Sequence, residues 1–132
     1  MAADGSLYFN SDRPGGKGGM DIWVAKYEKG DFQVPELLPA LNSDLAENDL
    51  CIDPQDRFLI LNRYVPEDNS INLWISFKEG KVWQKPILLE KINQPDVWEL
   101  TPYVSPDGRH FLCEIDGEIR IWQVDDIHGI MP

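Results

Sequence analysis

The chemistry open to this chain is bounded by a short inventory of reactive side chains. Its 132 residues include 23 Asp and Glu, two His and two Cys. Paired carboxylates could cleave glycosides by acid–base catalysis, which needs two carboxyl groups roughly 5 to 10 Å apart. Among so many acids, a pair in the sequence indicates nothing without geometry. The chain has no Gly-x-Ser-x-Gly nucleophile motif.

Metal and thiol chemistry are also weakly indicated. His110 and Cys113 stand three residues apart on one expected strand, and side chains at that spacing point to opposite faces. They are therefore poor partners for a zinc ion. A disulfide requires Cα atoms within about 7 Å, and Cys51 and Cys113 fall on different repeats, so we interpret both as buried free thiols. We expect no metal and no cofactor.

One glycine-rich stretch, Pro14-Gly15-Gly16-Lys17-Gly18-Gly19, resembles a phosphate-binding loop in composition. Phosphate loops present their amides at the start of a helix and carry Lys followed by Ser or Thr. Neither feature follows here. We interpret the stretch as a flexible hairpin loop between two strands.

These residues are embedded in a repeat of about 50 residues. Asp21-Ile22-Trp23 returns 51 residues later as Asn72-Leu73-Trp74. Further matches at offsets of 51 or 52 are Phe32 with Trp83, Pro35 with Pro86, Asn42 with Asn93, Glu47 with Glu99 and Pro54 with Pro106. A period of this length built from short strands is typical of propeller blades.

Each copy is expected to be β throughout, because its apolar runs are short, rich in aromatic and β-branched residues, and bounded by turn formers. The middle copy predicts four strands near residues 50–53, 58–63, 71–77 and 86–89. Residues 53–57 and 105–109 carry Pro with Asp or Gly, which predicts hairpin turns. The fold class predicted is all-β, with four-stranded antiparallel blades.

The third copy is shorter between its second and third strands. Arg57 to Trp74 spans 17 positions and Arg109 to Trp122 spans 13, if Arg120-Ile121-Trp122 is the third copy of the motif. The Asp116-Gly117 pair suits a two-residue primed turn. On this alignment Trp23, Trp74 and Trp122 occupy equivalent core positions on the third strand.

The segments 105–109, 11–16 and 21–23 resemble the TolB-type, WD-repeat-like β-propeller repeats of bacterial proteins. The likeness is greatest to the C-terminal part of such propellers, which implies a last strand over 121–125 and a short apolar tail over 127–132. It also implies relatives that are exported or attached to the cell envelope. The middle copy departs from the pattern, with Pro54-Gln55-Asp56 in place of Pro-Asp-Gly and Asn72 in place of Asp.

The expected blade repeats are residues 4–48, 49–100 and 101–126, within one domain. Closing a propeller takes at least about four blades, so three leave open faces. The first copy lacks room for its own first strand and the third stops after its third. Two interpretations remain open: the chain is part of a longer propeller, which we favour, or two copies form a six-bladed homodimeric ring.

Charge and hydropathy narrow the partners. A net charge of −11 and a pI near 4.4 oppose binding to nucleic acid, whose phosphates would be repelled. No apolar stretch approaches the 18 residues of a membrane helix, and the first residues, Met1-Ala2-Ala3-Asp4, lack the pattern of a secretory signal. We expect no membrane insertion, and the compartment stays open.

The remaining candidate site is a loop surface. The loops over residues 11–20, 39–48, 64–70 and 91–100 are expected to gather on one rim, opposite the Pro-Asp-Gly turns, and loops held by a rigid scaffold are common recognition sites. The rim residues selected are Asp12, Arg13, Arg63, Tyr64, Trp98 and Glu99. An Arg could bind a carboxylate through two parallel hydrogen bonds, and Trp98 could stack on a sugar. The alternative, favoured for each residue taken singly, is intramolecular: Asp12 and Arg13 pair with neighbouring blades, Glu47 and Glu99 accept backbone or Arg hydrogen bonds between blades, and Trp98 fills a blade junction.

The predicted function is a non-catalytic module that presents this rim to a protein, peptide or cell-envelope glycan. The alternative is the propeller part of a hydrolase, either a glycosidase or a peptidase, with carboxylates around a central channel.

Overall fold

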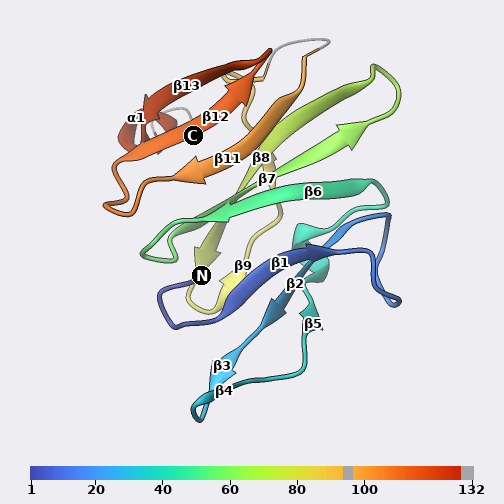
Figure 1. The fold of residues 1–132 in the computed structure, drawn as a ribbon, viewed down its shortest axis with the longest axis vertical. Coiled ribbons are helices and arrows are strands. Elements are labelled where there is room, and N and C mark those ends of the chain that lie inside the picture. Colours follow the sequence, from blue (N-terminus) through green and yellow to red (C-terminus); the bar gives the residue numbers. More distant parts are fainter. Residues whose placement is uncertain (94–96, 129–132) are drawn as a thin grey trace.

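The computed structural model describes residues 1–93 and 97–128, and the strands dominate it (Figure 1). The first sheet contains β1 (Leu7–Ser11), β2 (Asp21–Ala25) and β5 (Glu36–Leu37), with a β3 (Tyr27–Glu28) and β4 (Asp31–Phe32) ribbon beside it. The third sheet contains β11 (Glu99–Val104), β12 (His110–Ile115) and β13 (Glu118–Gln123). All strand pairings within the sheets are antiparallel, so the all-β prediction is confirmed.

The middle sheet contains the four strands that the sequence predicts. From one edge of the sheet to the other, the strands are β6 (Ala46–Ile52), β7 (Phe58–Val65), β8 (Ser70–Glu79) and β10 (Ile87–Leu88). A further short strand, β9 (Val82–Trp83), pairs with the end of β8. The three sheets follow one another along the long axis of the molecule (Figure 1). The 3-10 helix Pro39–Leu41 precedes the connection from the first sheet to the middle one.

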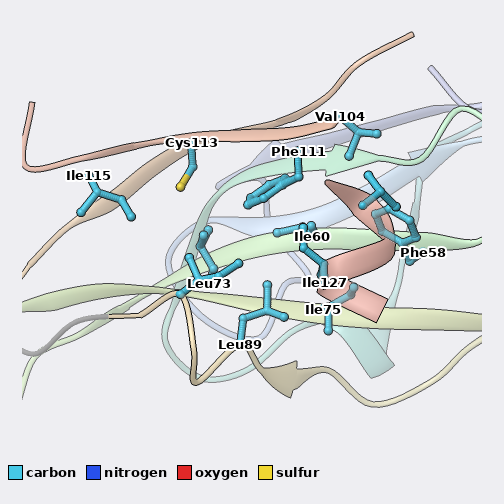
Figure 2. Close-up of a cluster of buried hydrophobic side chains, with 12 residues drawn as sticks. Phe58, Ile60, Leu73, Ile75, Leu89, Val104, Phe111, Cys113, Ile115 and Ile127 are labelled. Carbon is cyan, nitrogen blue, oxygen red and sulfur yellow. The ribbon is translucent and has the colours of Figure 1, made fainter. Parts of the chain in front are cut away.

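The middle sheet is buried on both faces, and β7 shows this most clearly. Leu59 and Leu61 pack against Ile22 and Leu41 of the first repeat. Phe58 and Ile60, which alternate with them, pack on the third sheet. Figure 2 shows the second of these clusters, with Phe111, Cys113 and Ile115 of β12 facing the side chains of β7 and β8. A strand with two buried faces explains the unbroken apolar run at 58–61.

The 51-residue repeat has a direct structural counterpart in two asparagines. The Asn42 Oδ1 accepts the Ile22 amide at 2.7 Å and its Nδ2 donates to the Ile22 carbonyl at 2.9 Å. The Asn93 side chain makes the same two bonds, at 2.7 and 2.9 Å, with Leu73. Each asparagine therefore binds the segment after the last strand of its repeat to β2 in the first sheet or to β8 in the middle sheet.

The Pro-containing turns lie at one edge of the stack, as predicted. Asp53 is fully buried, and its carboxylate accepts Arg57 Nε at 2.7 Å and Nη2 at 2.9 Å. Burial alone would raise the pKa of Asp53, but the hydrogen bonds from Arg57 outweigh it and hold the pKa below its ordinary value. Arg57 also reaches the carbonyl of Gly108 in the next such turn, at 3.5 Å.

The third hairpin closes in two residues, as the sequence predicts, but the Trp122 alignment was wrong. Asp116 and Gly117 have φ of 52° and 81°, the signature of a type I′ turn. Glu114 faces Ile119, 5 residues on, whereas its counterpart Asn62 faces Leu73, 11 residues on. The hairpin is therefore shorter by six residues, not four. Trp122 takes the position of Ser76, stacking on Phe111 with ring centroids 5.7 Å apart.

The C-terminal segment also differs from the expectation. The last strand, β13, ends at Gln123, and residues Val124–His128 form the short helix α1 instead of continuing the strand to 125. Ile127 is fully buried in the cluster between the middle and third sheets. A helix of one turn leaves too few residues for a helical period to be read. Residues 129–132 of the expected tail lie outside the described part.

We predict that Asn42→Ala and Asn93→Ala destabilise the fold by similar amounts, about 1–3 kcal/mol each, because each substitution leaves a backbone amide and a backbone carbonyl without their hydrogen-bond partner. Urea unfolding followed by tryptophan fluorescence measures this change. Gln55→Ala, at an exposed turn position, is the control and is expected to stay within about 0.5 kcal/mol of the parent. A neutral effect at either asparagine would contradict the equivalence of the two clamps.

Candidate functional site

The long loops of the chain meet at one edge of the stack, to the right in Figure 1. Glu47 joins two of the repeats there, because its carbonyl accepts Asn10 Nδ2 at 2.7 Å and its carboxylate pairs with Arg63. Trp98 donates its indole N–H to the Asn69 carbonyl at 2.8 Å, which joins the β7–β8 loop to the segment before β11. We call this the long-loop edge. Residues 94–96 of the expected rim lie outside the described part.

Tyr64 and Trp98 are both bonded to one exposed residue, Asn69, and we call the two side chains the aromatic pair. The Tyr64 hydroxyl donates to Asn69 Oδ1 at 3.1 Å, while Trp98 bonds the Asn69 main chain. Asn69 has a left-handed φ of 53°, which Asn tolerates better than most residues. Trp98 is 47% exposed. The edge therefore exposes about half of an indole whose N–H is held by Asn69, together with a half-buried tyrosine bonded to the same residue.

Arg13 and Asp12 are exposed on the β1–β2 loop. Arg13 Nε donates to Ser11 Oγ at 3.1 Å, and the guanidinium carbon lies 4.9 Å from the Phe9 ring centroid and 5.4 Å from that of Trp23. This cation–π arrangement fixes the side chain over the outer face of the first sheet.

Arg63 and Glu99 occupy different positions from the other four. Arg63 Nε pairs with Glu47 Oε1 at 2.8 Å, its Nη2 donates to the Leu41 carbonyl at 3.1 Å, and its guanidinium covers Trp74. Glu99 is fully buried at the start of β11. The structure thus brings Asp12, Arg13, Tyr64 and Trp98 to the surface of the long-loop edge, and places Arg63 and Glu99 inside it.

Glu47 is a buried carboxylate whose pKa is raised by its surroundings. Its side chain is fully buried, and this burial raises its pKa although hydrogen bonds from Ser43 and the charge of Arg63 act in the opposite direction. The Ser43 hydroxyl and amide donate to Oε1 at 2.6 and 2.8 Å. Oε1 thus carries all of these bonds, and the group ties the first repeat to the middle sheet.

The glycine-rich loop is anchored by a residue that the sequence reasoning did not select. The buried Asp21 carboxylate accepts the amide of Lys17 at 3.0 Å and that of Gly18 at 3.2 Å. A Cβ on Gly16 would overlap this carboxylate, and one on Gly18 would overlap the Leu45 carbonyl oxygen. The amides of Lys17 and Gly18, which a phosphate-binding loop would direct at its ligand, donate to Asp21 instead. An acid two residues after the last glycine was the available signal.

A hollow in the described part lies away from these loops, between the first sheet and β9. Its volume is about 360 Å³, and both lysines and carboxylates line it. Lys26 pairs there with Glu36 at 3.4 Å, between two exposed side chains. Tyr8 and Trp83 close its base, joined by a hydrogen bond of 3.2 Å. Because its charges of opposite sign neutralise each other, the hollow has no clear preference for a charged ligand.

The thiols are protonated at neutral pH. Burial raises the pKa of both Cys51 and Cys113 to about 12, and both are free. His110 lies on the outer face of β12 and Cys113 on its buried face, as their spacing predicts. Residues 1–93 and 97–128 contain no group of three metal-ligating side chains. The same residues include no helix long and apolar enough to cross a membrane.

Comparison with known proteins gives no assignment: no protein-family model, curated protein or solved structure matches this chain.

We predict that Gly18→Ala destabilises the fold by about 1–3 kcal/mol, because the added methyl has no space beside the Leu45 carbonyl. The neighbouring Gly19→Ala is the matched control, since its Cβ would lie 3.6 Å from the Ala46 Cβ, an ordinary contact. Thermal unfolding by circular dichroism compares the two. Equal losses of stability would contradict the close packing of the glycine-rich loop against residues 44–46.

Proposed function

We propose that this protein is a non-catalytic interaction module, in which the long-loop edge binds a protein, peptide or cell-envelope glycan. The observation that carries the proposal is the aromatic pair of Tyr64 and Trp98. Burial of a Trp side chain is normally favourable, yet Trp98 stays 47% exposed, and its indole N–H is bonded to the Asn69 carbonyl. A rigid aromatic face beside a hydroxyl suits stacking on a sugar ring or on an apolar side chain.

The scaffold proposed for this edge is a partial β-propeller of the TolB-type, WD-repeat-like kind. Three observations support it: the 51-residue repeat, the matching clamps of Asn42 and Asn93, and the order of four strands in the middle sheet. The flanking sheets contain three strands each. On this proposal the chain supplies three blades of a larger ring, completed by further blades or by a second copy.

Two buried carboxylates at the long-loop edge, Glu47 and Asp21, have structural partners, which agrees with a non-catalytic module. Glu47 binds Ser43 and Arg63, and Asp21 binds the glycine-rich loop. A glycosidase instead needs one carboxyl as acid and a second as base or nucleophile, both open to substrate. This difference separates the proposed module from the hydrolase alternative.

The test uses glycan and peptide arrays probed with the purified chain and with Trp98→Ala and Tyr64→Ala variants. We expect Trp98→Ala to weaken binding about tenfold, since stacking on an aromatic face contributes about 0.5–1.5 kcal/mol beyond the area that it buries, and Tyr64→Ala to weaken it less. Tyr103→Ala is the matched control, because Tyr103 is 52% exposed on the third sheet, away from Asn69.

Binding that survives loss of Trp98 and falls with Tyr103 would contradict the proposed site. Turnover of a glycoside or peptide that a single Asp or Glu substitution abolishes would contradict the non-catalytic function and favour the hydrolase alternative.

A further inference from the structure

One edge of β1 has no partner strand among the described strands, whereas the equivalent strand edges in the other two sheets are covered. In the middle and third sheets, the strand equivalent to β1 is β7 or β12, and each carries a first strand along one edge, β6 and β11 respectively. β1 pairs with β2 alone among the described strands, which leaves its other edge without a partner strand. A strand edge with open amides and carbonyls is a template for another extended chain.

The covered edges show what such a chain looks like in this fold. Glu47 stands opposite Arg63, and after a register shift Ile52 stands opposite Leu59. In the third sheet, Glu99 stands opposite Ile115 and Val104 opposite Phe111, again after a shift. Both first strands thus supply a buried glutamate followed five residues later by a β-branched apolar residue. Asn10 pairs with Ile22 in the first sheet as Asn62 pairs with Leu73 in the middle sheet, so Asn10 and Asn62 are equivalent. The next residue of β1, Ser11, is therefore the equivalent of Arg63 and Ile115.

Arg13 places a guanidinium where Arg63 places its own. Arg63 lies over Trp74 with its guanidinium carbon 4.8 Å from the ring, and Arg13 lies 5.4 Å from the ring of Trp23, the repeat equivalent of Trp74. Arg63 donates from there to Glu47 on β6 and to a carbonyl of the preceding repeat. Arg13 donates to Ser11 through Nε, and its Nη atoms have no acceptor within residues 1–93 and 97–128. The arginine is therefore positioned for a carboxylate that a strand on this edge would carry.

We propose that the open edge of β1 binds an extended peptide segment with a glutamate followed five residues later by a β-branched apolar residue, the glutamate pairing with Arg13. The main-chain bonds to residues 7–11 provide the affinity and the Arg13 pair fixes the register. Leu7 and Phe9, on the face that Arg13 covers, lie beside the apolar residues of the incoming strand. This surface is separate from the aromatic pair, so the inference does not rest on the proposed function.

Two peptides copied from the chain serve as probes: residues 43–53 with Cys51→Ser, and residues 97–105. Each carries a fluorophore and is titrated with the full chain, with binding read by anisotropy. We expect saturable binding of both peptides. Replacing Glu47 or Glu99 in the peptide by Gln should weaken binding roughly tenfold, since a charged hydrogen bond contributes about that factor. Arg13→Gln in the protein should give the same loss.

The arginine comparison uses Arg109→Gln as control, because Arg109 is an exposed arginine in the turn at the opposite edge. Its binding should equal that of the parent chain. Amide hydrogen exchange of the saturated complex should show new protection at residues 7–11. Absence of saturable binding by both peptides, equal binding of the Glu and Gln forms, or protection confined to β13 would overturn the proposal. The thermal unfolding of Arg13→Gln, measured in parallel, shows that the variant is folded.

Discussion

The arrangement of this protein depends on a strand that is buried on both of its faces. In β7, consecutive apolar side chains point alternately into two cores, and the sheets on either side exist as layers because they cover those faces. Large-to-small substitutions at such positions typically cost about 2–5 kcal/mol. Where the strand reaches the long-loop edge, polar residues replace apolar ones, and they are buried too. Asn62 and Arg63 are accommodated there because β6 supplies partners within the sheet and the carbonyls of Glu99 and Leu41 supply partners from the neighbouring repeats.

This constraint explains why the candidate site divides into an inner and an outer part. Arg63 and Glu47 lie at the ends of strands whose faces are covered, so their polar atoms serve contacts between repeats. The buried Glu99 contributes its backbone carbonyl, which accepts Asn62 Nδ2 from the middle sheet at 3.5 Å. Asp12, Arg13, Tyr64 and Trp98 project from loops or strand ends beyond the last covered position. The rim residues thus share one edge of the fold but not one role.

Much of the fold could be predicted from the sequence, because turn chemistry and the repeat act locally. The four strands of the middle sheet, the Asp116-Gly117 turn and the equivalence of Asn42 and Asn93 all followed from residue types and spacing. The Trp122 error arose because two short motifs with the same letters can be shifted by two residues and keep the same face of a strand. Hydrogen-bonded pairs set the register, and these depend on hairpin length. An arginine bound to Glu47 is the alternative considered for the rim, and Arg63 fulfils it. Which arginine this would be could not be predicted, since its acceptors come from the preceding repeat and from another strand.

The two ends of the stack carry the features that the inner sheets hide. Ile119 and Ile121 on β13 are 73% and 62% exposed, although their cross-strand partners make them the equivalents of Leu73 and Ile75, which are buried between sheets. At the other end, Arg13 covers Trp23 as Arg63 covers Trp74. Repeats stabilised by their neighbours leave such surfaces wherever the array stops.

The central claim is that alternate residues of β7 enter two separate cores. Methyl-labelled nuclear Overhauser spectra test it most directly. We expect the methyl groups of Leu59 and Leu61 to show contacts to Ile22 and Leu41, and Ile60 to show contacts to the side chains of β12, Phe111 first among them. Contacts from Leu59 and Ile60 to one common set of residues, or no contact from β7 to either neighbouring sheet, would contradict it.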